Sequence, residues 1–394
     1  MSVARGDAVA LTRELVRVDS RNPTLVAGAP GEGRVARVLG DVLASWGFRV
    51  ELREAAPGRP NVLARIGGDQ TGARSLMFNG HIDVVGVEGM VHAPWEAIER
   101  EGRVYGRGSS DMKAGVAAMC AAALRAADGH ALNGEVIIAA VVDEEYSSLG
   151  TRALVAEGVR ADAAVVTEPT RLAIMPAHKG FVWIDVLVRG RAAHGSRWDV
   201  GVDAIRHAGL LLAELDAFDG EVLTKRHHAL LGRPSLHAST IAGGIGLSTY
   251  PDRCQFTVER RTLPRETTSQ VMAEMREVCS RVQERRPELS ADVGLIFEQP
   301  PSDVATDAPI VRALDRALRA RGEAVNLTGM SAWTDAAILN EAGIPAICFG
   351  PGDIALAHAA EEYVDVAEIE RATEVLRELA EHWCGEREGR GIRG

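Results

Sequence analysis

The sequence predicts an α/β protein: a large three-layer α/β domain interrupted by an inserted ferredoxin-like domain of βαββαβ order. Three observations carry this prediction. Helical and strand patterns alternate through the first part of the chain, an antiparallel pattern follows, and α/β character returns after residue 307. At 394 residues the chain is also long for a single hydrophobic core.

The first part reads as helices and short strands in turn. Two helices are expected within 7–45, separated by the loop SRNPT, and strands near 48–52 and 61–66. The segment SLMFNGHIDVV is an apolar strand that reaches Gly80 and His81, and an alanine-rich helix is expected from Asp111 to about Asp128. EVIIAAVV and ADAAVVTE are short apolar runs bounded by turn residues, which is typical of buried parallel strands.

The pattern changes after Pro176. FVWIDVLVRG alternates apolar and polar residues, as a half-exposed antiparallel strand does. A helix near 202–218, two strands in SLHASTIAGG and RCQFTVERRTL, a helix at 268–285 and the strand ADVGLIF complete a βαββαβ unit. The helix PIVRALDRALRARG and the strand PAICFG then return to α/β character. We therefore expect three segments, 1–178, 179–300 and 301–394, with the middle one inserted.

The composition is that of an ordinary globular protein and excludes some classes of function. The formal charge of −11 comes from dispersed acids without a basic stripe, which disfavours nucleic-acid binding. The apolar runs are far shorter than a membrane span, and no signal peptide is recognisable. Five scattered cysteines without a CxxC pair favour reduced thiols, so we expect a cytoplasmic protein.

Candidate metal ligands stand at or just beyond the expected strand ends, where open α/β sheets bind ligands. They are His81, Asp111, Glu145, Glu168 and His358. Two histidines and three carboxylates suit zinc or a similar divalent ion. Five ligands are too many for one open tetrahedral centre but enough for two metals that share a carboxylate. Asp83 shares a strand face with His81 and could hold its other ring nitrogen.

Each of these signals has a plainer reading. His81 and Asp83 could close a surface strand, Asp111 could be a helix N-cap, and Asp143, Glu144 and Glu145 could form a solvated turn. Three acids beyond a buried strand are costly unless cations offset them, which favours the metal reading. His194, in the expected insertion, could be an ordinary turn histidine. HExxH, GxSxG and GxxxxGK[ST] are absent.

Seven motifs in order carry a resemblance over nearly the whole length: NGHIDVV, GRGSSDMKAG, DEEYSSLGT, TEPT, AAHGS, ERRTLP and FGPG…AHAAEEY. With them the chain resembles the zinc amidohydrolase family of acetylornithine deacetylase, succinyl-diaminopimelate desuccinylase, aminoacylase and carboxypeptidase G type enzymes. The resemblance implies a catalytic domain (1–178 and 301–394) and a lid and dimerisation domain (179–300). It also implies a homodimer and two divalent ions, zinc with cobalt and manganese as alternatives.

The resemblance also implies roles for individual residues. Asp111 would bridge the metals, His81 and Glu168 would complete one metal, and Glu145 and His358 the other. Glu144 would be the general base, Asp83 would orient His81, and the Asp111–Met112 bond would be cis. His194 would polarise the scissile carbonyl in the partner subunit. The expected substrate contacts are Arg261, which would grip a carboxylate, Ser248, and Gly352 of the glycine-rich loop.

The resemblance implies a small-molecule substrate, an N-acyl amino acid or a short peptide. Ser248 replaces an asparagine that relatives often carry, and Trp333 and Ala337 replace residues of the desuccinylase pattern, which disfavours a succinylated diaminopimelate substrate. We expect an amidohydrolase that removes an N-acyl group from an amino acid or related amine. A dipeptidase or carboxypeptidase of the same family is the alternative, followed by a metal-binding protein without catalysis.

Overall fold

The computed structural model describes residues 3–129 and 132–385, and the chain forms two compact units. Unit 1 consists of Met1–Pro176, Val304–Thr328 and Thr334–Gly394. Unit 2 consists of Ala177–Asp303 and Gly329–Trp333. Unit 2 is thus an insertion into unit 1. The lid and dimerisation roles expected for residues 179–300 stay predictions.

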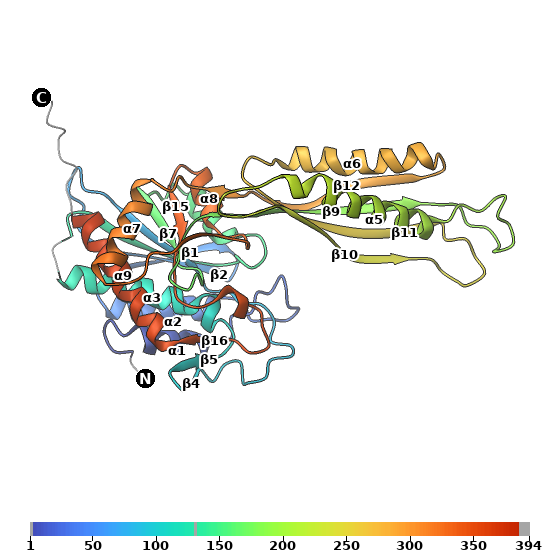
Figure 1. Cartoon of the computed structure of the whole chain (residues 1–394). Coiled ribbons are helices and arrows are strands. Elements are labelled where there is room, and N and C mark those ends of the chain that lie inside the picture. The colour runs from blue at the N-terminus through green and yellow to red at the C-terminus, as the bar shows by residue number, and fades with distance from the viewer. Residues whose placement is uncertain (1–2, 130–131, 386–394) are drawn as a thin grey trace, which may run out of the picture. The chain divides into compact units, whose positions relative to one another are not determined.

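Unit 1 is built mainly from a mixed sheet and its helices (Figure 1). Its helices are α1 (Ala8–Val16), α2 (Gly33–Ser45), α3 (Ala114–Gly129), α4 (Leu149–Ala156), α7 (Pro309–Ala320), α8 (Ala336–Glu341) and α9 (Val366–Gly385), with short turns η1 (Ser109–Lys113) and η3 (Ile354–Leu356). Its strands are β1 (Arg49–Ala56), β2 (Arg59–Gly67), β3 (Leu76–His81), β4 (Ile98–Arg100), β5 (Arg103–Tyr105), β6 (Glu135–Val141), β7 (Ala163–Val166), β15 (Ala346–Cys348) and β16 (Tyr363–Asp365). The chain passes between the units at four places: within β8 (Ile174–His178), after Asp303, within β14 (Leu327–Met330) and after Trp333.

The main sheet has the order β1-β2-β6-β3-β7-β15-β8-β13, in which β13 is Ser302–Asp303, and β14 also pairs with β8. Its centre is parallel, since β3 pairs in parallel with β6 and β7, and β15 with β7. The outer strands β1, β2 and β8 pair antiparallel with their neighbours. The central strands are buried on both faces, which explains why EVIIAAVV and ADAAVVTE read as continuous apolar runs.

Helices cover both faces of this sheet and give three layers. On one face α1, α3, α7 and α9 pack together with α2, and on the other α4 and α8 lie against the sheet (Figure 1). The small side chains of α3 let this helix approach the sheet closely. A Cβ at Gly115 would stand 1.9 Å from the carbonyl oxygen of Thr167, so only glycine fits there.

Unit 2 carries its own four-stranded antiparallel sheet, in the order β10-β11-β9-β12. Its elements are β9 (Gly180–Arg189), α5 (Ala204–Glu221), the turn η2 (Leu223–Lys225), β10 (Ser235–Gly243), β11 (Arg253–Thr262), α6 (Thr268–Arg285), β12 (Ser290–Gln299) and the short β13 (Ser302–Asp303). Helices α5 and α6 pack on one face of the sheet around a second hydrophobic core. The predicted βαββαβ order of this unit is confirmed.

Two local expectations differ from the structure. The helix expected to begin at Asp111 begins at Ala114, because Asp111 and Met112 have non-helical backbone angles and their peptide bond is cis. That cis bond matches the expectation from the resemblance. The sequence also gave no hint of the small antiparallel sheet β16-β5-β4, whose strands have only three residues each.

Two further expectations concern the environment of the chain. All five cysteines are free, and four of them are buried. Among the described residues, no helix combines the length and the apolar character that crossing a membrane would require.

Candidate metal centre

The predicted ligands follow four adjacent parallel strands of unit 1. His81 is the last residue of β3, Glu144 and Glu145 follow β6, Glu168 follows β7, and His358 lies in the long loop after β15. Asp111 comes from η1, directly before α3. Because the carboxyl ends of parallel strands meet at one edge of the sheet, residues far apart in sequence meet there.

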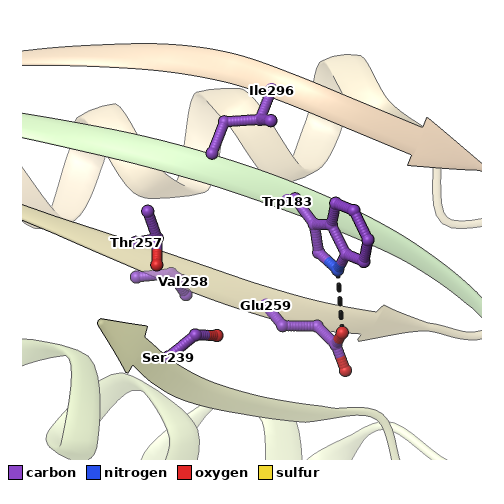
Figure 2. A pocket seen from close by; sticks show the side chains of 6 residues that line it. All are labelled: Trp183, Ser239, Thr257, Val258, Glu259 and Ile296. Carbon is purple, nitrogen blue, oxygen red and sulfur yellow. Dashed lines mark hydrogen bonds between the residues drawn. The ribbon is translucent and has the colours of Figure 1, made fainter. Parts of the chain in front are cut away.

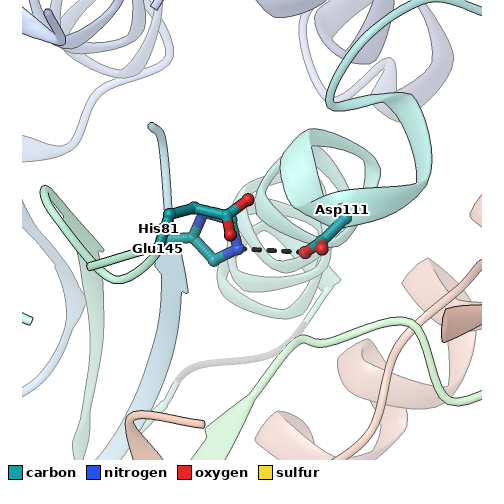
Figure 3. A group of neighbouring side chains, drawn as sticks. All are labelled: His81, Asp111 and Glu145. Atoms are coloured by element: carbon teal, nitrogen blue, oxygen red, sulfur yellow. Dashed lines mark hydrogen bonds and ion pairs between the residues drawn. The ribbon is translucent and has the colours of Figure 1, made fainter. Parts of the chain in front are cut away.

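Two groups of potential ligand atoms result, and within each group the atoms lie within 4.8 Å of one another. One group is His81, Asp111 and Glu145, and Figure 3 shows His81 paired with Asp111 beside Glu145. The other is His81, Glu144 and Glu168. His81 belongs to both groups, with its Nε2 3.0 Å from Asp111 Oδ1 and 3.9 Å from Glu144 Oε2.

His358 adds the second imidazole. Its Nε2 lies 2.9 Å from Glu145 Oε2 and 3.6 Å from Asp111 Oδ2. Its side chain is 54% exposed, whereas the side chains of Glu145 and Asp111 are 7% and 9% exposed. All five expected ligands therefore gather at one place, with His358 on the open side.

Asp83 uses two different groups here. Its main-chain oxygen lies 2.9 Å from His81 Nδ1, while its carboxylate Oδ1 is 3.6 Å from that nitrogen, too far for a hydrogen bond. The carboxylate instead accepts hydrogen bonds from the main-chain N–H groups of Glu144 and Glu145, both at 3.2 Å. The carbonyl contact favours the tautomer in which Nδ1 carries the proton and Nε2 offers its lone pair.

Burial and mutual charge set the pKa values of the acids. Burial, together with the negative charges of Glu168 and Asp335, raises the pKa of Glu144 well above its ordinary value, although His81 opposes the shift. The pKa of Glu168 is raised well above its ordinary value mainly by burial and the charge of Asp111. The hydrogen bond to Glu145 raises the pKa of His358 to about 9.

This set of residues fits a pair of divalent metal ions. Carboxylates and imidazole nitrogens are the donors that zinc and similar ions bind. Burial raises the pKa values of Glu144 and Glu168, and neighbouring acids raise them further. Cations at this place would balance that negative charge. How the ligands divide between the two ions, with Asp111 as the bridge, stays a prediction.

Unit 2 holds three further residues expected at the site, His194, Ser248 and Arg261. His194 and Ser248 are both exposed and lie in two loop segments that pair with each other. The N–H of Gly195 donates to Ser248 O at 2.7 Å, and His194 and Thr249 form an isolated antiparallel β-bridge. His194 Nδ1 also contacts Ser196 Oγ at 2.8 Å. The sequence did not signal that His194 and Ser248 would be neighbours.

Arg261 lies on β11, on the sheet face opposite the helices. Its Nε donates to Glu259 Oε1 at 2.6 Å, and its guanidinium lies 5.2 Å from the ring centroid of Phe181. The second carboxylate oxygen of Glu259 accepts the indole N–H of Trp183 at 2.8 Å (Figure 2). These contacts border a pocket of about 260 Å³, which is lined by Trp183, Ser239, Thr257, Val258, Glu259 and Ile296.

Gly352 lies in unit 1 and has a left-handed backbone, with φ +91°. A Cβ there would stand 2.5 Å from Ser110 Oγ, next to Asp111, so the glycine lets the two loops touch. Its N–H donates to Glu368 Oε2 at 2.9 Å. The substrate contact expected for Gly352 stays a prediction.

Two buried residues beside the acids were not predicted from the sequence. Asn22, in the loop SRNPT, donates through Nδ2 to Asp83 Oδ2 at 2.8 Å and to Asp143 Oδ1 at 3.0 Å. Asp335 accepts a hydrogen bond from Thr151 Oγ1 at 2.6 Å, and burial raises its pKa to about 6. Neither residue carries a sequence signal of its own, since a lone Asn in a loop and an Asp before a short helix are common.

Known proteins that are similar to this chain have the fold and the family that the sequence predicts. An acetylornithine deacetylase of Myxococcus xanthus is 32% identical over 352 residues, 88% of this chain and 90% of the relative. Aminopeptidase PepT of Bacillus cereus superimposes with a TM-score of 0.78 at 21% identity, over 97% of this chain and 99% of that one. The YXEP protein of Bacillus subtilis, a dinuclear metal-binding peptidase, superimposes with a TM-score of 0.73 at 16% identity, over 96% and 98%.

These likenesses confirm the predicted fold class, and the sequence match confirms the resemblance. The family model described as peptidase family M20/M25/M40 matches residues 77–382. That range contains every candidate ligand and the whole of unit 2. The chain therefore belongs to peptidase family M20/M25/M40 and is a metallohydrolase of that family.

Proposed function

We propose that this metallohydrolase is an N-acyl-amino-acid amidohydrolase in which Glu144 is the general base. The observation that carries the proposal is the setting of Glu144. Its carboxyl is buried beside the ligand candidates, 3.9 Å from His81 Nε2, and its pKa is raised well above the ordinary value. A carboxylate at this place can take a proton from water and later give it up again.

The residues of the proposed site have different roles. His81, Asp111, Glu145, Glu168 and His358 would hold two divalent ions, zinc in the first place with cobalt and manganese as alternatives. The chemistry that such a pair supplies is polarisation of the amide carbonyl and a lowered pKa of water. The carboxylate of Asp83 holds the main-chain N–H groups of Glu144 and Glu145. It would thereby keep Glu145 in place as a metal ligand and Glu144 in place as the general base.

The proton balance runs through Glu144. Its carboxylate takes one proton as the oxygen of water bonds to the carbonyl carbon. When the C–N bond breaks, the same carboxyl gives that proton to the departing nitrogen, and the products are a carboxylic acid and an amine. His194 would stabilise the developing oxyanion from the partner subunit, a contribution whose loss costs roughly 10²–10³ in rate for comparable donors.

The acyl-amino-acid substrate is supported by the deacetylase relative, and a dipeptide or carboxypeptidase substrate is the alternative. Both kinds of substrate place a carboxylate near the amide, so Arg261 would serve either, with Ser248 and Gly352 as further contacts. A panel of N-acetyl amino acids, N-succinyl amino acids and dipeptides, assayed with the metal-loaded protein, separates the two. We also expect a homodimer and a cytoplasmic location.

The test of the base is Glu144→Ala. We expect the variant to bind both metal ions while kcat for the best acyl-amino acid falls about 10²–10⁴-fold, the usual contribution of general acid–base catalysis. Glu145→Ala is the matched comparison and should lose metal, which metal analysis after dialysis measures. Near-wild-type turnover by Glu144→Ala would remove Glu144 from the mechanism.

A further inference from the structure

Glu362 is a fully buried acid whose carboxylate receives four hydrogen bonds. Oε1 accepts the main-chain N–H groups of Ser110 and Asp111 at 3.0 and 3.1 Å. Oε2 accepts Gly108 N–H at 3.1 Å and Arg107 Nη1 at 2.6 Å. All four donors belong to residues 107–111. The carboxylate therefore holds the backbone that ends at Asp111.

Glu362 also ends the loop that carries His358. The main-chain oxygen of Glu362 accepts Gly106 N–H at 3.2 Å. At the other end of the loop, Ser110 Oγ lies 3.1 Å from Asp353 N and 3.2 Å from Asp353 O. The loop 353–362 is thus fastened to the segment 106–111 at both of its ends, and His358 lies between the two fastenings.

The side chain of His358 itself is little buried. Its side chain is the most exposed of the expected ligands, and its backbone is left-handed, with φ +59°. Its ring contacts Glu145 and approaches Asp111 within 3.6 Å. A shift of either loop would change the distance between Asp111 and His358 directly.

We infer that Glu362 is a positioning residue that sets the separation of Asp111 and His358 and so the affinity for a second metal ion. This inference rests on the proposed two-metal function. A carboxylate is required because its two oxygens accept from four donors. A glutamine would offer one oxygen and turn an N–H₂ group toward the remaining N–H groups. Residues that orient metal ligands typically change metal affinity 10- to 100-fold when they are replaced.

The test is Glu362→Gln against Glu361→Gln, in the full-length protein. Glu361 is the adjacent acid and is exposed, so it is a matched control for the loss of charge. Metal is removed with a chelator, folding of the metal-free protein is checked by circular dichroism, and Zn²⁺ is titrated by calorimetry. We expect Glu362→Gln to bind one Zn²⁺ about as wild type does and the other about 10- to 100-fold more weakly. Glu361→Gln should bind both ions as wild type does.

Glu362→Asp keeps the charge on a shorter side chain and should fall between wild type and Glu362→Gln. If Glu362→Gln does not fold without metal, the Zn²⁺ titration of Glu362→Asp is the test, and weaker binding of one Zn²⁺ supports the inference. A folded variant that binds both ions with wild-type affinity would overturn the inference and leave the proposed function standing. If neither variant folds, the inference is overturned as well, because Glu362 would then be needed for the fold as a whole. A wild-type protein that takes up no pair of ions would instead overturn the proposed function.

Discussion

At the scale of single residues, Asp83 contacts four residues through two different groups. Its carbonyl oxygen contacts His81 Nδ1, and its carboxylate holds the N–H groups of Glu144 and Glu145 and the amide of Asn22. The backbone contribution does not depend on the identity of the side chain. The contacts of the carboxylate do depend on the side chain, and they position Glu144 and Glu145 rather than His81.

Asp83→Asn separates these contributions. The variant keeps the main-chain oxygen, so His81 should stay oriented and both metal ions should bind with affinities within a few-fold of wild type. The asparagine N–H₂ would face N–H donors, and Glu144 would lose its fixed position. We expect kcat to fall about 10- to 100-fold, as for other groups that support an active site. Steady-state kinetics and metal analysis on the same samples check this, and a variant that loses metal instead would show that the carboxylate also positions a metal ligand, His81 or Glu145.

The sequence predicts which residues gather at the site better than it predicts how they touch. Strand ends placed His81, Glu145 and Glu168 at one edge of the sheet, because apolar runs identify buried parallel strands and the carboxyl ends of such strands meet at one edge. The contact between His81 and the Asp83 carbonyl arises from main-chain direction, which no side-chain pattern records. Asn22 is likewise brought in by tertiary packing, from a loop 61 residues before Asp83.

At the scale of elements, the packing of α3 against the end of β7 positions two ligands. Asp111 precedes α3 by a few residues and Glu168 follows β7, and the helix meets the strand at Gly115 and Thr167. The missing side chain at Gly115 therefore sets how closely the two ligand-bearing elements approach.

Gly115→Ala tests this approach. Its Cβ would stand 1.9 Å from a main-chain oxygen, so helix and strand must separate. We expect unfolding free energy to fall by about 1–3 kcal/mol, as overpacking usually costs. Zn²⁺ affinity should fall as well. The control is Gly209→Ala in α5, where a Cβ meets nothing within 4 Å. That exposed change should stabilise the protein by about 0.5–1 kcal/mol. Urea unfolding followed by circular dichroism measures both, and equal stability of the two variants would contradict the expectation.

The elements with a strong periodicity were the ones that the sequence predicted well. The helix at 268–285 coincides with α6, and the alternating segment 181–190 coincides with β9 within one residue. Helix α9, 20 residues long, is an exception, because it was not predicted. The short helices α4 and α8 and the short strands β4, β5, β8, β13, β14 and β16 were also missed. Such short elements are fixed by their neighbours in space, since a few residues carry too little periodicity to identify them.

At the scale of the whole molecule, unit 2 exposes apolar side chains around the loops that hold His194 and Ser248. Trp198, Ile245 and Leu247 have exposed fractions of 81%, 83% and 109%. Large apolar side chains gathered on a surface are typical of sites that contact another protein. This supports the proposal that a second copy of the chain covers this part of unit 2.

Leu247→Asp should weaken the proposed dimer. A buried aspartate without a partner is costly, so we expect the dimer dissociation constant to rise at least about tenfold, which corresponds to ~1.4 kcal/mol. Val91→Asp, at an exposed apolar residue of unit 1, is the control. Sedimentation equilibrium gives both constants. A wild-type protein that is monomeric at micromolar concentration, or a Leu247→Asp variant that dimerises as wild type does, would contradict the proposed interface.

The insertion of unit 2 into unit 1 has a consequence for how the protein is made. Four of the expected ligands, His81, Asp111, Glu145 and Glu168, are translated before unit 2, whereas His358 follows it. A ribosome that stops within the insertion releases a product with three of the acids and a single histidine. Such a fragment also lacks the loop 353–362 that Glu362 fastens to the segment before Asp111. The proposed second metal site can therefore form only after synthesis has passed unit 2 and reached His358. Chains that end earlier would be released without this site.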